Sequence, residues 1–144
     1  MKKGFTLAVA ESCTGGLLGS VITSVPGSSS FFLGGVVSYS NAAKENILNV
    51  KLSTMIENGA VSEETAVEMA EGARELFGSD VAVSITGVAG PGGGTAAKPV
   101  GLVWIGISVK EGTSAKRFDF GGSRDDVRTS AAKAAMELII KTVE

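Results

Sequence analysis

The sequence predicts an α/β fold: a three-layer α/β/α sandwich with a mixed, mostly parallel sheet, formed as a single domain over residues 1–144. Short apolar runs alternate with segments of helical periodicity in the first half of the chain, which favours parallel strands covered by helices. Two further strand-like runs join through Glu111-Gly112 and favour an antiparallel pair. No internal repeat or linker divides the chain, and its length is typical of one domain.

In the first half, polar turns separate the expected elements. Pro26-Gly27 ends the first helix, and Asn41 is expected to cap the second. The elements expected here are, in chain order, a strand at 5–10, a helix at 14–25, a loop at 28–30, a strand at 33–38, a helix at 42–48 and a loop at 49–61, which could hold a short helical turn.

In the second half, the helix boundaries have clear capping residues. Ser62 is placed to cap a helix that ends before Gly78, and the spacing of Ser123 and Asp126 forms a capping-box variant. The elements expected here are a helix at 62–77, strands at 80–86, 101–109 and 113–120, and a last helix that begins at Ser123.

Composition excludes several classes of function. The formal net charge is −2 and no run of like charges occurs, so we expect no nucleic-acid binding through a basic face. No apolar stretch is long enough to span a membrane, and Glu11 interrupts the first apolar run too early for a signal peptide. We therefore expect a cytoplasmic protein with no membrane partner.

The absence of histidine restricts the possible chemistry further. It excludes a Ser-His-Asp triad, a Cys-His pair and a histidine metal site. The single cysteine, Cys13, excludes an intrachain disulfide and a cysteine-rich metal site. We expect no metal and no cofactor. In an enzyme, the group that transfers protons would be Lys, Tyr, Asp, Glu or Cys, and a serine nucleophile would need a Ser-Lys or Ser-Tyr-Lys arrangement.

Three polar stretches follow expected strands, at 11–16, 39–44 and 86–94. Ligands of open α/β sheets gather beyond the carboxyl ends of the strands, so we expect these stretches to converge. In the first stretch, Ser12 and Thr14 could simply cap the following helix. A cap does not require the paired glycines that follow, and glycines inside a helix are costly unless a ligand must approach the backbone. Cys13 is either a second possible nucleophile or a small buried apolar residue.

The second and third stretches are open to two interpretations each. Tyr39 and Lys44 could be a solvated pair, or Lys44 could act as a base if burial and the helix dipole lower its pKa. The glycine-rich segment at 87–94 lacks the ending of a P-loop; it is either a flexible loop or a source of backbone N–H groups for an anion. Arg124 and Arg128 either face Asp125 and Asp126 or serve a bound anion.

Four blocks together resemble the CinA C-terminal domain family, the nicotinamide-nucleotide amidases. The blocks are AESCTGG, GGVVSYSNAAKENILNV, GAVSEETAVEMAEGAR and SITGVAGPGGGTAAKPVGLVWIGI. They keep the family's order over nearly the whole chain. One departure is that Gly-Ser-Arg stands at 122–124, where the family often has Gly-Asp-Arg. The family's arginine therefore corresponds to either Arg124 or Arg128.

The resemblance implies hydrolysis of nicotinamide mononucleotide to nicotinic acid mononucleotide and ammonia, in NAD salvage, without a metal. It implies Ser12 as nucleophile with Tyr39 and Lys44 as its catalytic partners. We also expect a homo-oligomer. The alternative is a non-catalytic module that binds nucleotide or phosphate, or an interaction domain. The residues expected to bind the substrate are Thr14, Gly15, Asn41, Thr86, Gly87, Gly90, Arg124 and Arg128.

Overall fold

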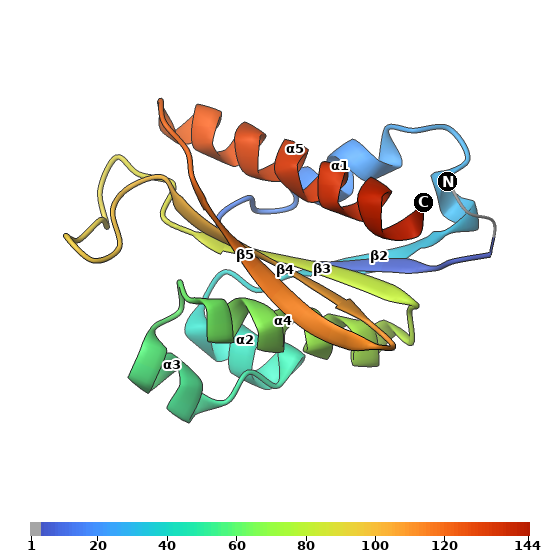
Figure 1. The fold of residues 1–144 in the computed structure, drawn as a ribbon, viewed down its shortest axis with the longest axis horizontal. Coiled ribbons are helices and arrows are strands. Elements are labelled where there is room, and N and C mark those ends of the chain that lie inside the picture. Colours follow the sequence, from blue (N-terminus) through green and yellow to red (C-terminus); the bar gives the residue numbers. More distant parts are fainter. Residues whose placement is uncertain (1–3) are drawn as a thin grey trace.

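The computed structural model describes residues 4–144 and contains one mixed sheet of five strands in the order β2-β1-β3-β4-β5 (Figure 1). β1 pairs in parallel with β2 and β3, whereas the β3–β4 and β4–β5 pairs are antiparallel. The predicted fold class is thereby confirmed. The strands are β1 Leu7–Glu11, β2 Phe32–Val37, β3 Val81–Gly87, β4 Leu102–Val109 and β5 Gly112–Asp119.

Helices cover both faces of the sheet, and each face has its own apolar core. Figure 1 shows α1 and α5 on one face and α2, α3 and α4 on the other. Leu18 and Ile22 of α1 pack with Val127 of α5 in the first core, while Leu48 and Met69 lie in the second. The helices are α1 Leu17–Thr23, the 3₁₀ turn η1 Ser28–Ser30, α2 Asn41–Leu48, α3 Leu52–Asn58, α4 Glu63–Phe77 and α5 Arg124–Val143.

Several predicted boundaries are confirmed by their caps. The Ser62 hydroxyl accepts the Thr65 N–H, and Gly78 ends α4 in the left-handed conformation with φ +62°. At the start of α5, the Ser123 hydroxyl accepts the Asp126 N–H, and the Asp126 carboxylate accepts the Ser123 N–H. These caps work locally, and their residue spacing in the sequence is therefore diagnostic.

Other boundaries were predicted wrongly. The first helix begins at Leu17 and not at 14, because Gly15 and Gly16 have positive φ of 58° and 105° and lie in the preceding turn. The segment at 49–61, expected to be a loop that could hold a short helical turn, contains the helix α3. The cap of α2 is Ser40 and not Asn41: the Ser40 hydroxyl accepts the Ala43 N–H.

The topology fixes where a site can form. β1, β2 and β3 are adjacent and run in the same direction, so their carboxyl ends lie at one edge of the sheet. The turn after β1, the segment between β2 and α2, and the glycine-rich loop after β3 all leave the sheet there. Within residues 4–144, no helix is both long and apolar enough to cross a membrane.

Candidate active site

A cavity of about 310 Å³ opens at the carboxyl ends of β1, β2 and β3. The structure brings the three polar stretches of the sequence together in its walls. Ala60 and Val61, which precede α4, complete the walls of the cavity. No sequence pattern marks these two residues as part of a site. The lining residues are Ser12, Cys13, Tyr39, Asn41, Lys44, Ala60, Val61, Thr86, Gly87, Val88, Ala89, Gly90, Gly92, Gly93 and Arg124.

The shortest contact between reactive side chains in this cavity joins Lys44 and Ser12. Lys44 Nζ lies 3.1 Å from Ser12 Oγ. The same nitrogen donates to the main-chain carbonyl oxygens of Ser38, at 2.8 Å, and Tyr39, at 3.2 Å. Lys44 is 1% exposed and Ser12 is 8% exposed. The amine is therefore held by three oxygen atoms in a site with little access to water.

Burial shifts the acid–base behaviour of two cavity residues. It lowers the pKa of the Lys44 ammonium below its ordinary value of 10.5, because the charged form loses solvation. Burial also raises the pKa of the Cys13 thiol to about 11, which leaves the thiol protonated at neutral pH. The environment therefore favours a neutral amine at Lys44 and disfavours a thiolate at Cys13.

The turn after β1 is fixed by Arg128. Its Nε donates to the Cys13 carbonyl oxygen at 3.1 Å, and its Nη2 donates to that of Thr14 at 3.0 Å. Arg128 does not line the cavity, and neither do Thr14 and Gly15, two of the expected substrate-binding residues. Gly15 lies on the outside of the turn, and the Thr14 side chain is buried.

The N–H groups at the N-terminal end of α1 are bonded within the protein and are not available to an anion. The Glu11 carboxylate accepts the N–H groups of Leu18 and Gly19 at 2.8 and 2.9 Å. The sequence did not reveal this role of Glu11, since no spacing rule connects a strand residue to a helix seven positions later. Within the part of the chain that the structure describes, the N–H groups of Cys13 and Thr14 donate to no protein acceptor.

Arg124 also lines the cavity. Its Nη1 donates to the Gly90 carbonyl oxygen at 2.7 Å, and its Nη2 donates to the Tyr39 hydroxyl at 3.2 Å. Tyr39 is 61% exposed and sits at the rim, so its hydroxyl contacts Arg124 while its carbonyl oxygen contacts Lys44. Of the two candidate arginines, Arg124 thus faces the cavity and Arg128 supports the turn behind it.

The other residues expected to bind the substrate lie at the cavity, but one of them has a structural contact. Asn41, Thr86 and Gly87 all line the cavity. The Thr86 side chain is buried, and its hydroxyl donates to the Ala60 carbonyl oxygen at 2.8 Å. Thr86 therefore ties the segment before α4 to the end of β3. Among residues 4–144, no three His, Cys, Asp or Glu side chains are grouped closely enough to hold a metal ion.

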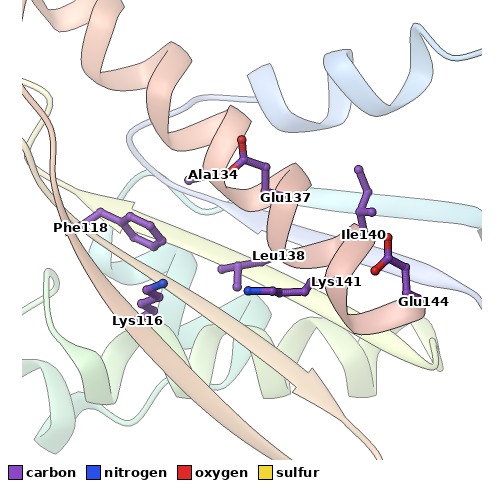
Figure 2. A pocket seen from close by; sticks show the side chains of 8 residues that line it. All are labelled: Lys116, Phe118, Ala134, Glu137, Leu138, Ile140, Lys141 and Glu144. Carbon is purple, nitrogen blue, oxygen red and sulfur yellow. The ribbon is translucent and has the colours of Figure 1, made fainter.

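A second cavity, of about 350 Å³, lies between β5 and the C-terminal half of α5. Figure 2 shows Phe118 and Lys116 of β5 together with Leu138 and Lys141 of α5 in its walls. It contains no serine, threonine or cysteine side chain and no residue of the three polar stretches. It therefore lacks a nucleophile of the type found at Ser12.

Comparison with known proteins identifies relatives over nearly the whole chain. A curated "CinA-like protein" of Geotalea uraniireducens is 52% identical over 96% of this chain and 33% of its own length. A "putative competence-damage inducible protein" of Caldanaerobacter subterraneus is 53% identical over 99% of this chain and 35% of its own. The chain thus spans about a third of the length of these relatives.

Solved structures share the fold. A competence/damage inducible protein of Agrobacterium tumefaciens superposes with a TM-score of 0.95 at 39% identity, over 98% of this chain and 87% of that chain. A competence damage-inducible protein of Klebsiella pneumoniae gives 0.92 at 36% identity, over 95% and 85%. The family model of the CinA C-terminal domain matches residues 1–143. The chain belongs to the CinA C-terminal domain family.

Proposed function

We propose that this chain is an amidase that hydrolyses the carboxamide of nicotinamide mononucleotide to nicotinic acid mononucleotide and ammonia. The observation that carries the proposal is the 3.1 Å distance from Lys44 Nζ to Ser12 Oγ inside a cavity that also holds Arg124. A serine next to a buried lysine is a nucleophile with its base, and the chain has no histidine to take that place.

The hydrogen bonds of Lys44 suit a neutral amine. A neutral amine has two N–H groups and one lone pair. The two N–H groups match the carbonyl oxygens of Ser38 and Tyr39, which accept from Nζ. In that state the lone pair is left for the remaining neighbour, the Ser12 hydroxyl, whose oxygen lies 3.1 Å from Nζ, and it can accept the hydroxyl proton. Burial supports this state because it lowers the Lys44 pKa.

In the first step, Ser12 Oγ bonds to the carboxamide carbon while Lys44 takes the hydroxyl proton. The N–H group of Cys13, which lines the cavity and donates to no acceptor within residues 4–144, can stabilise the tetrahedral oxyanion, to which one well-placed donor contributes about 3 kcal/mol. The carbon–nitrogen bond then breaks, and Lys44 passes its proton to the departing ammonia. Water attacks the resulting ester with Lys44 again as base, and the acid leaves Ser12.

Arg124 is the residue suited to the phosphate of the nucleotide. Its guanidinium is oriented by Gly90 and Tyr39 and faces the cavity. Gly92 and Gly93, of the same loop as Gly90, also line the cavity, and their N–H groups donate to no acceptor within residues 4–144. A guanidinium beside backbone N–H groups is a common arrangement for binding phosphate. In this role Tyr39 orients Arg124 at the rim.

The purified chain incubated with nicotinamide mononucleotide tests the proposal. We expect ammonia and nicotinic acid mononucleotide in equal amounts. A rise in melting temperature with the nucleotide but no ammonia would instead indicate a binding module. Bound ligand at 100 times its dissociation constant adds about 2.7 kcal/mol to the free energy of unfolding. Neither ammonia nor a thermal shift would indicate an interaction domain.

A further inference from the structure

Glu11 is a buried carboxylate to which the proposed mechanism gives no part. Its side chain is 2% exposed and lies against the start of α1. Oε1 accepts the Leu18 N–H at 2.8 Å, and Oε2 accepts the Gly19 N–H at 2.9 Å. Both carboxylate oxygens are thus used on the first turn of α1.

The cap of α1 is unusual in its source. A helix of this kind is normally capped by the side chain of the residue just before it, usually Ser, Thr, Asp or Asn. Gly16 occupies that position here, with φ +105°, and has no side chain to offer. The cap comes instead from Glu11, the last residue of β1. The helix is therefore tied to the strand that ends immediately before the nucleophile, Ser12.

Hydrogen bonds compensate the burial of this carboxylate. The ion pairs found within residues 4–144 are Arg117–Asp119 and Arg128–Asp125, and neither involves Glu11. A buried carboxylate without a cation is unfavourable unless strong donors surround it. The two N–H groups at the positive end of α1 are such donors. The same two bonds leave that end of α1 unavailable to an external anion.

Glu11 also connects the nucleophile to its base. It immediately precedes Ser12 in the chain. Its carbonyl oxygen accepts the Ser38 N–H at 2.8 Å and the Ser38 hydroxyl at 3.3 Å. The carbonyl oxygen of Ser38 in turn accepts from Lys44 Nζ at 2.8 Å. Glu11 therefore stands between the residue that attacks and the residue that holds the base in place.

We propose that Glu11 is a positioning residue for the Ser12–Lys44 pair. Its carboxylate locks the β1–α1 turn against α1, and this keeps Ser12 Oγ within hydrogen-bond distance of Lys44. The proposal rests on the proposed amidase function for its kinetic test. Small displacements of a reacting group lower the rate of a chemical step strongly, about 100-fold for 1 Å.

Glu11→Gln tests the proposal with little change in side-chain size. The amide has one oxygen for the two N–H groups, and its NH₂ cannot accept the second. We expect kcat for nicotinamide mononucleotide to fall about 10- to 100-fold. KM should stay within about twofold, and the pH dependence should be unchanged, because burial and not Glu11 lowers the Lys44 pKa. A kcat within about twofold of wild type in folded protein would overturn the proposal.

Asp80→Asn is the control, because Asp80 is an exposed carboxylate that also accepts two hydrogen bonds but lies away from the cavity. The Asp80 carboxylate accepts the Thr6 N–H at 2.8 Å and the Thr6 hydroxyl at 3.0 Å, next to the opposite end of β1. If Glu11 only stabilised the fold, Glu11→Gln would lower the free energy of unfolding but would keep the kcat per folded molecule, as Asp80→Asn does. We expect Asp80→Asn to retain kcat and Glu11→Gln to lose it. Equal kcat values in the two variants would overturn the proposal.

A second readout separates this inference from the identity of the substrate. The rate at which a small sulfonyl fluoride modifies Ser12, followed by mass spectrometry, reports the nucleophile without any nucleotide. We expect modification about tenfold slower or more in Glu11→Gln, and unchanged in Asp80→Asn. Wild-type labelling at Ser12 without ammonia release would refute the nucleotide substrate and leave the role of Glu11 supported by this difference. Equal labelling rates, or no labelling of wild type, would overturn it.

Glu11→Asp provides the comparison if Glu11→Gln does not fold. It keeps the carboxylate but shortens its reach by one methylene, so the same losses of kcat and labelling rate are expected. Failure of both variants to fold would also overturn the proposal, because Glu11 would then determine folding and not the position of Ser12.

Discussion

Ser12 and Lys44 are 32 positions apart in the chain, and their side chains meet with Oγ and Nζ 3.1 Å apart. The contact forms because β1 and β2 are parallel neighbours whose carboxyl ends lie together. Ser12 follows β1, and Lys44 lies on α2, the helix after β2. The amine is 1% exposed, and this burial lowers its pKa and so favours its neutral form.

Replacement of Lys44 by methionine should abolish most activity while preserving the fold. Methionine keeps an unbranched apolar stem, one heavy atom shorter than the lysine side chain, but has no amine to accept the Ser12 proton. We expect kcat/KM for nicotinamide mononucleotide to fall about 10³-fold, within the usual range for loss of a general base. The control is Lys133→Met, an exposed lysine on α5, which should keep wild-type activity. Wild-type activity in Lys44→Met would exclude Lys44 as the base.

The stability of the protein should depend on pH through Lys44. Its pKa in the folded state lies below the ordinary value of 10.5, which the unfolded chain retains. Between those two pKa values the unfolded chain binds more protons, so the free energy of unfolding rises with pH in that window. Lys44→Met lacks this dependence. The free energy of unfolding of Lys44→Met minus that of wild type, measured with urea, should therefore be greatest below the folded-state pKa. This difference should shrink as the pH approaches 10.5. A difference that grows with pH would contradict the lowered pKa.

Replacement of Arg124 by alanine should weaken binding of the phosphate. The guanidinium faces the cavity but contacts neither Ser12 nor Lys44 within hydrogen-bond distance. We expect KM for nicotinamide mononucleotide to rise about tenfold or more, in line with loss of a charged hydrogen bond. Nicotinamide riboside, which lacks the phosphate, should be processed equally by wild type and variant. Arg117→Ala on β5 serves as control, and an equal loss with both substrates would exclude Arg124 as the phosphate ligand.

Gly72→Ala should destabilise the fold although alanine favours helices. A Cβ at Gly72 on α4 would lie 1.9 Å from the Leu48 carbonyl oxygen at the end of α2. The two helices must move apart, at a cost of about 1–3 kcal/mol or more. Gly121→Ala is the matched control, because a Cβ there meets nothing within 4 Å. Urea unfolding measures both, and equal stability of the two variants would show that α2 and α4 accommodate the methyl group freely.

Much of the fold follows from local sequence signals. The strands are short apolar runs, and the caps at Ser62 and Ser123 involve residues three positions apart. α3 was predicted only as a short helical turn that a loop could hold, because its preceding residue, Lys51, makes no side-chain cap and only Thr54 and Met55 of the helix are buried. The start of the first helix was predicted too early because helical periodicity does not reveal the positive φ of Gly15 and Gly16.

The candidate site is less accessible to sequence reasoning. The three polar stretches could be located because each follows a strand. The different orientations of the Arg124 and Arg128 side chains could not be predicted, since both residues lie in the first two turns of α5. Their contacts, with Gly90 and Tyr39 for one and with Cys13 and Thr14 for the other, depend on how the whole helix sits on the sheet. The cap by Glu11 likewise depends on the angle between β1 and α1.

Ammonia release by Ser12→Ala tests most directly whether the Ser12 hydroxyl attacks the carboxamide. The comparison is with Ser20→Ala, which removes an exposed hydroxyl on α1. With nicotinamide mononucleotide, Ser20→Ala should release ammonia at the wild-type rate, and Ser12→Ala should be slower by about 10³-fold or more. Ammonia release by folded Ser12→Ala at the wild-type rate would contradict the account.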